Sequence, residues 1–508
     1  MTMKNILLVK GKSRYDSTDN YIEEWAAAIR KLGCNTCVLD GWSLANPKLY
    51  NHIISKYSFD AALDCNGTLA IWNAVDNLPK KTILGTYLCD PPTGLRERLE
   101  KSDDRTIIFG CDQNFCDYMD KFFPMIKHTK FIPLSGSFCS EWIPYEKRTI
   151  DILFTGSYAD PEAWKERAYS DIGRGGVLEK FLDDMLDDII NNPQYTLYEC
   201  LSRNLKKYQI TVTDSEFDKL ATDFLATDFY ARFYYRDKLM RTLLQAGLKI
   251  HVYGLGWEKF RTDFKDNLIV HEGGTYAARK ALVNTKIALN IMPWFKDAFQ
   301  ERIASAMLSK AVAVTDESRY IMDHFENNKD MVIYSLKDLD SLAEKIRYLL
   351  QHPDEASGIA ENGNQKIQSH TWYHRAYDMM RAMEEAFDVS LIQNGQGRDL
   401  SLTLEYPDDH TVALDAIYEL HKLSSFAGQD IGKAECLSQS DGIYLNDKFQ
   451  NLKKRFSSYL PEIEMHPYIE NGLRSLDEKE KRSMVELFSI QCKALMSNLL
   501  IREQNFNF

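Results

Sequence analysis

Residues 284–321 constrain the fold most, because their apolar and polar segments follow one another in the order strand, loop, helix and strand. Lys286–Ile291 is a short apolar strand, Arg302–Leu308 an apolar helix and Ala311–Thr315 a second buried strand. Two strands joined by a crossover helix lie parallel in one sheet, and ligands bind at the carboxyl ends of such strands. The loop before this helix and the turn after the second strand are therefore expected to carry functional residues.

Apolar strands alternate with helical or turn segments over most of the chain. In the first part of the chain, the predicted strands are 6–9, 37–39, 59–63, 82–88, 106–109 and 130–134. A second series begins with a strand and turn at 151–157 and continues with strands at 249–253, 268–270, 286–291, 311–315 and 332–334. Continuous apolar strands are typical of parallel sheets buried on both faces. The alternation predicts an α/β fold with two Rossmann-like units.

The predicted elements divide the chain into three parts. Residues 1–140 form an N-terminal Rossmann-like domain, and residues 141–389 form a second such domain that carries a helical insertion at about 159–246. A linker at 390–399 then leads to a helical accessory domain at 400–508. We expect the two helical regions to recognise an acceptor or to mediate assembly into an oligomer.

Composition excludes several classes of protein. The net charge of −12 argues against a general nucleic-acid binder, which would show a basic face, but leaves room for a local basic pocket. No apolar stretch approaches the length that spans a bilayer, and the N-terminal apolar run is too short for a signal peptide. We therefore expect a cytoplasmic protein with reduced thiols. Cys34 and Cys37 form a CxxC pair, but no second pair or histidine cluster completes a zinc site.

Several motifs of residues 249–387 together resemble a known family. They are Val252–Gly254 followed by Trp257, Lys286–Ile291, Glu301–Arg302, Ala313–Asp316, Asp338–Leu350 and His370–Arg375. In order and spacing they resemble the C-terminal domain of the CgeB-type (spore maturation protein) glycosyltransferase family. The resemblance implies the GT-B fold, in which two Rossmann-like domains face each other. It also implies transfer of a sugar from a nucleoside-diphosphate donor to a protein, glycan or other hydroxyl acceptor, without a cofactor.

Three glycine turns are candidates for contact with the donor diphosphate that this resemblance implies. They are Gly156-Ser157, Gly254 with Gly256, and Gly273-Gly274. Glycine allows close approach of the backbone to a phosphate, and the free N–H groups of a helix N-terminus favour anions. The alternative is that these are ordinary turns. Arg302 at a helix start suits phosphate oxygens, and its alternative role is a surface ion pair with Glu301.

The acidic residues of the family motif are only partly present. The resemblance places Ser305 where a glutamate usually binds the ribose, and Asp297 where an acid usually lies near the donor sugar. Either the donor binds differently, Glu301 substitutes, or the chain has lost activity and serves as a degenerate partner of an active transferase. Asn290 and Asp316 end the two strands of the motif. Asp316 either contacts the sugar or base, or belongs to the cap of the next helix.

The N-terminal domain is expected to supply the acceptor side and, for an inverting enzyme, a general base. Asp90 is the first candidate because two prolines follow it, and Asp112 and Asp64 are the others. Each is alternatively a turn-forming aspartate. The pair Asp338 and Asp340 has the spacing of a metal-binding motif, but it precedes an amphipathic helix and is expected to cap it. We therefore expect no metal site. A sugar-nucleotide epimerase and a small-molecule sensor are weaker alternatives.

Overall fold

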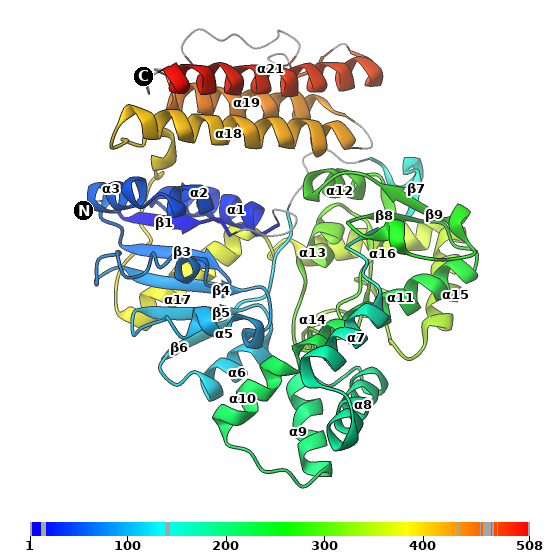
Figure 1. Cartoon of the computed structure of the whole chain (residues 1–508). Coiled ribbons are helices and arrows are strands. Elements are labelled where there is room, and N and C mark those ends of the chain that lie inside the picture. The colour runs from blue at the N-terminus through cyan, green and yellow to red at the C-terminus, as the bar shows by residue number, and fades with distance from the viewer. Residues whose placement is uncertain are drawn as a thin grey trace.

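The computed structural model describes residues 3–11, 17–137, 143–434, 437–457, 459–460, 469, 472–474 and 476–505. Two six-stranded sheets, parallel throughout, form the centre of the molecule. They lie side by side, the first in blue and the second mostly in green (Figure 1). The α/β fold with two facing Rossmann-like units is therefore confirmed.

The first sheet has the strand order β2-β1-β3-β4-β5-β6. Its strands are β1 (Asn5–Val9), β2 (Asn35–Leu39), β3 (Ala61–Cys65), β4 (Ile83–Leu88), β5 (Thr106–Gly110) and β6 (His128–Phe131). Its helices are α1 (Ser17–Lys31), α2 (Gly41–Ala45), α3 (Pro47–Tyr57), α4 (Thr68–Ile71), α5 (Arg96–Leu99) and α6 (Gln113–Phe122). We call these elements the first unit. The central strands β3, β4 and β5 are buried along their whole length, which explains their continuous apolar sequences.

The second sheet has the order β12-β11-β10-β7-β8-β9. Its strands are β7 (Ile150–Thr155), β8 (Ile250–Tyr253), β9 (Leu268–His271), β10 (Thr285–Leu289), β11 (Val312–Asp316) and β12 (Val332–Tyr334). Five helices follow β7 within the range of the predicted insertion, namely α7 (Pro161–Ile172), α8 (Gly176–Asn191), α9 (Leu197–Lys207), α10 (Asp214–Asp223) and α11 (Leu225–Gln245). The remaining helices are α12 (Thr275–Leu282), α13 (Glu301–Leu308), α14 (Arg319–His324), α15 (Leu339–Gln351), α16 (Pro353–Ile367) and α17 (Trp372–Phe387). We call these elements the second unit.

The chain crosses between the units twice. The first crossing follows β6, which ends at Phe131, whereas the predicted strand extends over 130–134. The strand ends early because the segment after it packs on α13 of the second unit. An added Cβ at Gly136 would come within 2.4 Å of the Ser305 nitrogen. The second crossing brings α17 back onto α1 and the first sheet. The strand prediction was therefore wrong at its C-terminal end, where tertiary packing overrides local preference.

The predicted linker 390–399 is ordered along the edge of the first sheet. The Gln393 nitrogen donates to Leu32 O at 2.9 Å, and the Thr36 nitrogen donates to Arg398 O at 2.9 Å. Thr36 and Asp399 form a parallel bridge beside β2. This segment covers an otherwise unpaired strand edge.

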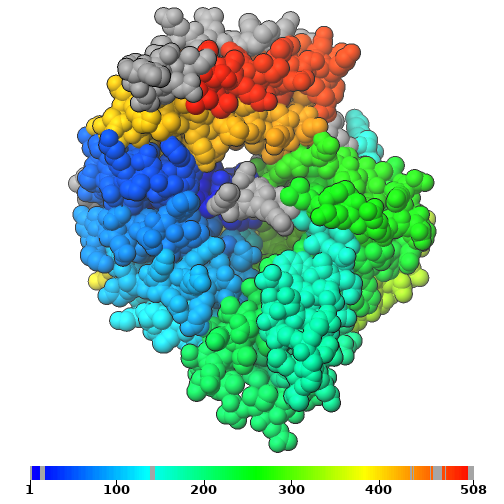
Figure 2. All heavy atoms as spheres, viewed as in Figure 1, coloured from blue at the N-terminus to red at the C-terminus, as the bar shows by residue number. Residues whose placement is uncertain are grey.

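Three long helices follow, and we call them the C-terminal helical layer. They are α18 (Asp409–Gln429), α19 (Gln439–Arg455) and α21 (Glu478–Asn505), shown in yellow to red above both units (Figures 1 and 2). Lys422 pairs with Asp40 of the first unit, whereas Lys433 pairs with Glu272 of the second. The layer thus bridges the two units.

Short 3₁₀ turns complete the secondary structure. They are η1 (Pro92–Leu95), η2 (Tyr145–Lys147), η3 (Trp257–Lys259), η4 (Lys265–Asn267), η5 (Leu400–Thr403) and η6 (Ile431–Lys433). Among the residues that the structure describes, no helix combines the length and apolar character needed to cross a bilayer.

Candidate active site

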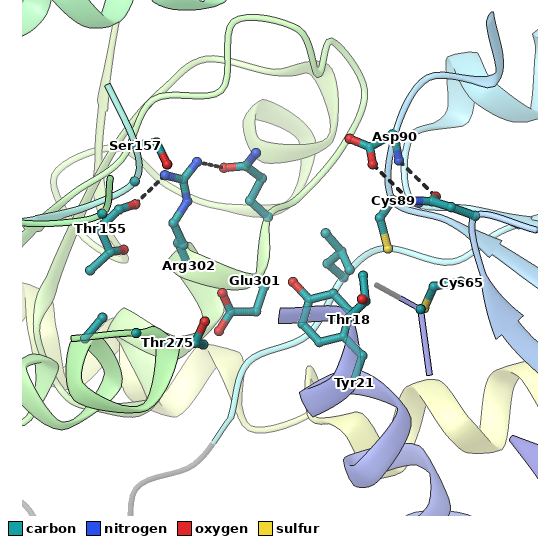
Figure 3. A pocket seen from close by; sticks show the side chains of 18 of the residues that line it. Thr18, Tyr21, Cys65, Cys89, Asp90, Thr155, Ser157, Thr275, Glu301 and Arg302 are labelled. Carbon is teal, nitrogen blue, oxygen red and sulfur yellow. Dashed lines mark hydrogen bonds between the residues drawn. The ribbon is translucent and has the colours of Figure 1, made fainter. Parts of the chain in front are cut away.

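A cleft of about 820 Å³ lies between the two units and is lined by residues of both. The carboxyl ends of parallel strands meet here, as expected for a ligand site in such folds. Figure 3 shows Asp90, Cys89 and Tyr21 of the first unit facing Arg302 and Glu301 of the second.

The cleft brings together most of the candidate residues from the sequence. Those that line it are Asp90, Gly156, Ser157, Gly254, Gly273, Gly274, Glu301, Arg302 and Ser305. The candidates that lie outside its lining are Asp64, Asp112, Gly256, Asn290, Asp297 and Asp316. Their functional roles stay predictions, but the two groups differ in what their side chains contact.

The turn after β7 is built from backbone contacts that only glycine permits. The Gly156 nitrogen donates to Tyr253 O at 2.8 Å, and Trp257 Nε1 donates to Gly156 O at 2.8 Å. Gly254 has φ 138°, and an added Cβ there would lie 2.4 Å from Gly156 O. A Cβ at Gly256 would lie 2.1 Å from Tyr158 O. The glycines after β8 therefore hold the turn after β7 in place.

Arg302 lies directly over this turn. Its Nη1 donates to Thr155 O at 2.5 Å, and its Nη2 donates to the Gln300 side chain at 2.8 Å (Figure 3). A Cβ added to Gly156 would be 2.8 Å from Arg302 Nη1, so glycine is needed for this approach. Burial lowers the pKa of Arg302 below its ordinary value, but an arginine remains charged. These hydrogen-bond acceptors are neutral oxygens, and the negative charges of Glu301 and Asp316 act on the guanidinium from further away.

Four further arginines line the cleft, and the sequence analysis did not identify them. They are Arg98, Arg232, Arg236 and Arg279. The acidic residues of the lining are Asp90 and Glu301. Arg232 and Arg236 lie on α11 together with Phe229 and Phe233 of the lining. Their spacing of three and four residues places them on one helical face, and that periodicity was the available signal. Arg232 is paired with Asp228 at 2.8 Å, so its charge is offset, but arginines still outnumber acids in the lining of this cleft.

Ser305 and Glu301 are joined on α13, one helical turn apart. The Ser305 hydroxyl donates to Glu301 Oε1 at 2.5 Å and accepts from the Ser137 nitrogen at 3.1 Å. Ser305 is 1% exposed because the crossing segment covers it. Glu301 is only half-buried and reaches the cleft. Glu301 therefore places a carboxylate at this point of the cleft, and its substitution for the usual ribose acid stays a prediction.

Asp90 is exposed in the cleft and is oriented by Asn66. The Asn66 side chain donates to Asp90 Oδ2 at 2.9 Å and accepts from the Cys89 nitrogen at 2.8 Å. Asn66 has φ 54°, a left-handed conformation that asparagine tolerates better than most residues. Arg98 donates to Asn66 O at 3.0 Å, which adds a positive charge beside this turn.

Asp112 is 1% exposed and its carboxylate accepts from backbone groups. Oδ1 accepts from the Asn114 nitrogen at 2.8 Å, which caps α6. Oδ2 accepts from the Lys296 nitrogen at 2.9 Å across the unit boundary. Burial raises the pKa of Asp112 above its ordinary value. These contacts join the two units beside the cleft rather than within it.

Asn290, Asp297 and Asp316 also make structural contacts. Asn290 donates to the Thr315 hydroxyl at 3.0 Å, and Asp316 accepts from the Met292 nitrogen at 2.8 Å. Burial raises the pKa of Asp316 to about 7. Asp297 pairs with Arg319 at 3.2 Å. Asp64 is buried and accepts from the Leu69 nitrogen at 2.7 Å, and burial raises its pKa to about 6.

The Gly273-Gly274 turn lines the cleft, but its helix N-terminus already holds an anion. Asp430 of the C-terminal helical layer accepts from the backbone nitrogens of Gly274 at 3.2 Å and Ala277 at 2.9 Å. It also accepts from the Tyr276 nitrogen at 3.4 Å. A phosphate could use these N–H groups only by displacing the carboxylate. Asp338 likewise accepts from the Ser341 nitrogen at 3.2 Å, as expected for the cap of α15.

Comparison with known proteins adds independent information. The family model described as glycosyl transferase-like matches residues 236–381. No curated protein matches the chain in sequence. Among solved structures, sucrose-phosphate synthase from Thermosynechococcus elongatus is similar at 11% identity, over 76% of this chain and 100% of that one, with a TM-score of 0.46.

Two other solved structures show the same degree of likeness. Anabaena HepE in complex with UDP-glucose is 10% identical over 75% of this chain and 99% of that one, with a TM-score of 0.46. The DNA modifying enzyme β-glucosyltransferase is 12% identical over 76% of this chain and 100% of that one, with a TM-score of 0.44. Residues 236–381 therefore match a glycosyl transferase-like domain, and they lie in a chain built from two parallel six-stranded α/β units.

Proposed function

We propose that the protein is a GT-B glycosyltransferase related to the CgeB type, which transfers a sugar from a nucleoside-diphosphate donor to a hydroxyl acceptor. The observation that supports this most is Arg302, whose guanidinium lies over the Gly156 turn inside a basic cleft between two units. A diphosphate is the common ligand that needs both a close backbone approach and a planar cation. UDP-glucose, which HepE binds, is the first donor to test.

In this proposal the cleft stabilises the leaving diphosphate without a metal. Arg302 and the N-terminal N–H groups of α13 would neutralise the charge that develops as the bond between sugar and phosphate breaks. Binding in a cleft also holds donor and acceptor in line, which lowers the entropic part of the barrier. Asp90, held by Asn66, is the candidate base for the acceptor hydroxyl.

The acceptor side belongs to the first unit in this proposal. We keep the division into domains at 1–140 and 141–389, with the layer at 400–508 as an accessory domain. The acceptor is a protein or glycan, and the exposed Trp72 and Ile71 at the first-unit side of the cleft are suited to contact its apolar faces.

The second candidate function is a degenerate partner of an active transferase. Ser305 at the position of the usual ribose acid favours it. Glu301 argues against it, because this carboxylate lies in the cleft one helical turn away and accepts from Ser305 itself. The two functions differ in whether the cleft binds a donor.

Thermal stability in the presence of nucleotides tests the proposal. A ligand that binds only the folded protein raises its melting temperature. We expect UDP, GDP, dTDP or CMP, or one of their sugar conjugates, to do so, and Arg302→Ala to weaken that binding about 30-fold (~2 kcal/mol). Arg319→Ala is the control, since Arg319 is an exposed arginine that does not line the cleft. A folded protein that responds to none of these ligands contradicts the donor-binding function.

A further inference from the structure

The C-terminal helical layer contacts both units through each of its first two helices. On α18, Lys422 pairs with Asp40 of the first unit at 3.0 Å. Asp430, directly after α18, caps α12 of the second unit and accepts from the Ala277 nitrogen at 2.9 Å. At 1.5 Å per residue, Lys422 and Asp430 are about 12 Å apart along the helix axis. This part of α18 therefore extends from one unit to the other (Figure 1).

The second of these helices, α19, makes the same connection in the opposite direction. Near its start, Asp441 accepts from the Tyr276 hydroxyl of α12 at 2.5 Å. Further along, Lys448 Nζ lies 3.7 Å from Glu23 Oε2 of α1. These two contacts are about 10 Å apart along the helix axis. Both helices thus join α12 of the second unit to the first unit.

The contact between the layer and α12 is packed. The Tyr276 ring lies against Phe426 of α18 and Tyr444 of α19, with centroids 5.4 and 5.7 Å away. Asp441, which accepts from Tyr276, is 0% exposed. Packed aromatic pairs and a buried hydrogen bond to a carboxylate stabilise a contact more than an exposed ion pair does. Tyr276 is therefore the main anchor of the layer on the second unit.

The helical insertion joins the units at the other end of the molecule. Its helices α9 and α10 lie below the two sheets in Figure 1, whereas the layer lies above them. The Tyr198 ring of α9 packs on the Tyr118 ring of α6, with centroids 4.3 Å apart. Phe217 of α10 stacks on Phe122 of α6 at 5.5 Å. The second unit thus contacts the first through the insertion as well as through the layer.

The cleft extends between these two attachments. Its lining includes Arg279 of α12, which the layer contacts, and Phe229 of α11, which belongs to the insertion. Two units of one chain ordinarily move relative to each other unless the interface between them is large and apolar. To open as a hinge, a cleft needs at least one free end, and here both ends are attached.

We propose that the layer and the insertion together hold the two units at a fixed separation, so that the cleft keeps one width with and without a ligand. A cleft that is already formed needs no binding free energy for its closure. The layer then acts by fixing the position of α12 relative to the first unit. This inference concerns the fold and does not depend on the proposed function.

The test measures the separation of the units in the full-length protein by double electron–electron resonance. One spin label replaces Lys80 of the first unit and the other Asp354 of the second, which are both exposed. Both labels are introduced as non-canonical amino acids, so that the cysteines stay unlabelled. We expect a single narrow distance distribution, whose mean changes by less than about 2 Å when UDP or GDP is added. A broad or two-peaked distribution without nucleotide, or a larger shift with it, overturns the inference. The measurement without nucleotide is decisive even if the proposed function fails.

A double variant, Tyr276→Ala with Asp430→Ala, tests the part played by the layer. It removes the aromatic anchor and the cap of α12, and the distribution should widen by more than about 2 Å because one end of the cleft is then free. The matched control is Tyr348→Ala with Asp338→Ala, which removes an exposed tyrosine and the cap of α15 in the same unit. A double variant that stays folded by circular dichroism and keeps the narrow distribution overturns the role of the layer. If the double variant does not fold, the distribution of the unaltered protein still decides between one width and several.

Discussion

Two glycine turns at the same edge of the second sheet have different partners. The turn after β7 contains Gly156 and lies under the guanidinium of Arg302. The turn after β9 contains Gly274 and leads into α12, whose first N–H groups bind the Asp430 carboxylate. Both line the cleft. The first turn lies beside the guanidinium of Arg302, which a ligand could contact. At the second turn the N–H groups already donate to the Asp430 carboxylate.

This difference shows what a glycine turn means in such a fold. A helix N-terminus attracts anions whatever their source. Asp430 lies 156 residues after Gly274, so local sequence carries no sign that it caps α12. A glycine turn is a strong candidate for a phosphate site only when its N–H groups are open, and long-range packing decides that.

The largest expected effect is on the pH dependence of stability, and it concerns Asp316, the last residue of β11. The carboxyl end of β11 lies at the same edge of the sheet as the two turns. Burial raises the pKa of Asp316 from 3.8 to about 7, so the folded protein binds a proton that the unfolded chain has already released. Its contribution to stability is complete below about pH 4 and is lost as pH rises to about 7, by about 1.4 kcal/mol for each pH unit. Asp316→Asn should therefore flatten the pH dependence of the unfolding free energy and stabilise the protein at pH 8. An unchanged profile would show that Asp316 is not closed off from solvent.

The second prediction compares alanine at the two turns. Gly156→Ala places a methyl group against Arg302 and should weaken nucleotide binding about tenfold (~1.4 kcal/mol). Gly274→Ala places its methyl 3.0 Å from Asp430 Oδ2 and should leave nucleotide affinity within about twofold. Calorimetry on both variants measures this. Equal losses would mean that both turns bind the ligand.

The third prediction removes the carboxylate at α12. Asp430→Ala should lower the unfolding free energy by about 1 kcal/mol, the usual cost of a lost helix cap, with nucleotide affinity unchanged. Hydrogen exchange should become faster in 275–282. Asp408→Ala is the matched control, because Asp408 caps α18 instead. The role of Asp430 would be contradicted if α12 exchanged as slowly as before.

The smallest expected effect concerns Asp297, which the sequence placed near the donor sugar. It pairs outside the lining of the cleft with Arg319, whose side chain is mostly exposed, and a pair with one exposed partner contributes about 1 kcal/mol or less. Asp297→Asn should therefore change neither nucleotide affinity nor stability measurably. A tenfold loss of affinity would restore the role that the sequence suggested.

The fold was predictable because most of its strands are largely apolar. The strands β1 and β11, for example, could be identified from Ile6–Val9 and Ala311–Thr315 alone. The end of β6 could not, because the chain leaves the sheet to pack on α13. Neither could the course of 390–399, whose bonds to β2 and α1 connect residues more than 350 positions apart.

The site was predictable where a residue follows its own strand or starts its own helix. Arg302 and Gly156 are of this kind. The arginines of α11 were missed because a long helical insertion gives no sign of which face meets the cleft. Asp112 was a reasonable candidate as a polar residue after a buried strand. Its contact with the Lys296 nitrogen depends on how the two units meet, which local sequence does not specify.

A crystal structure of the protein with bound UDP would test the central claim most directly. Our account predicts that the phosphates contact the Gly156 turn and Arg302, while Asp430 keeps its bonds to α12. Phosphates bound to the Gly274 turn with Asp430 displaced, or a nucleotide bound outside the cleft, would contradict it.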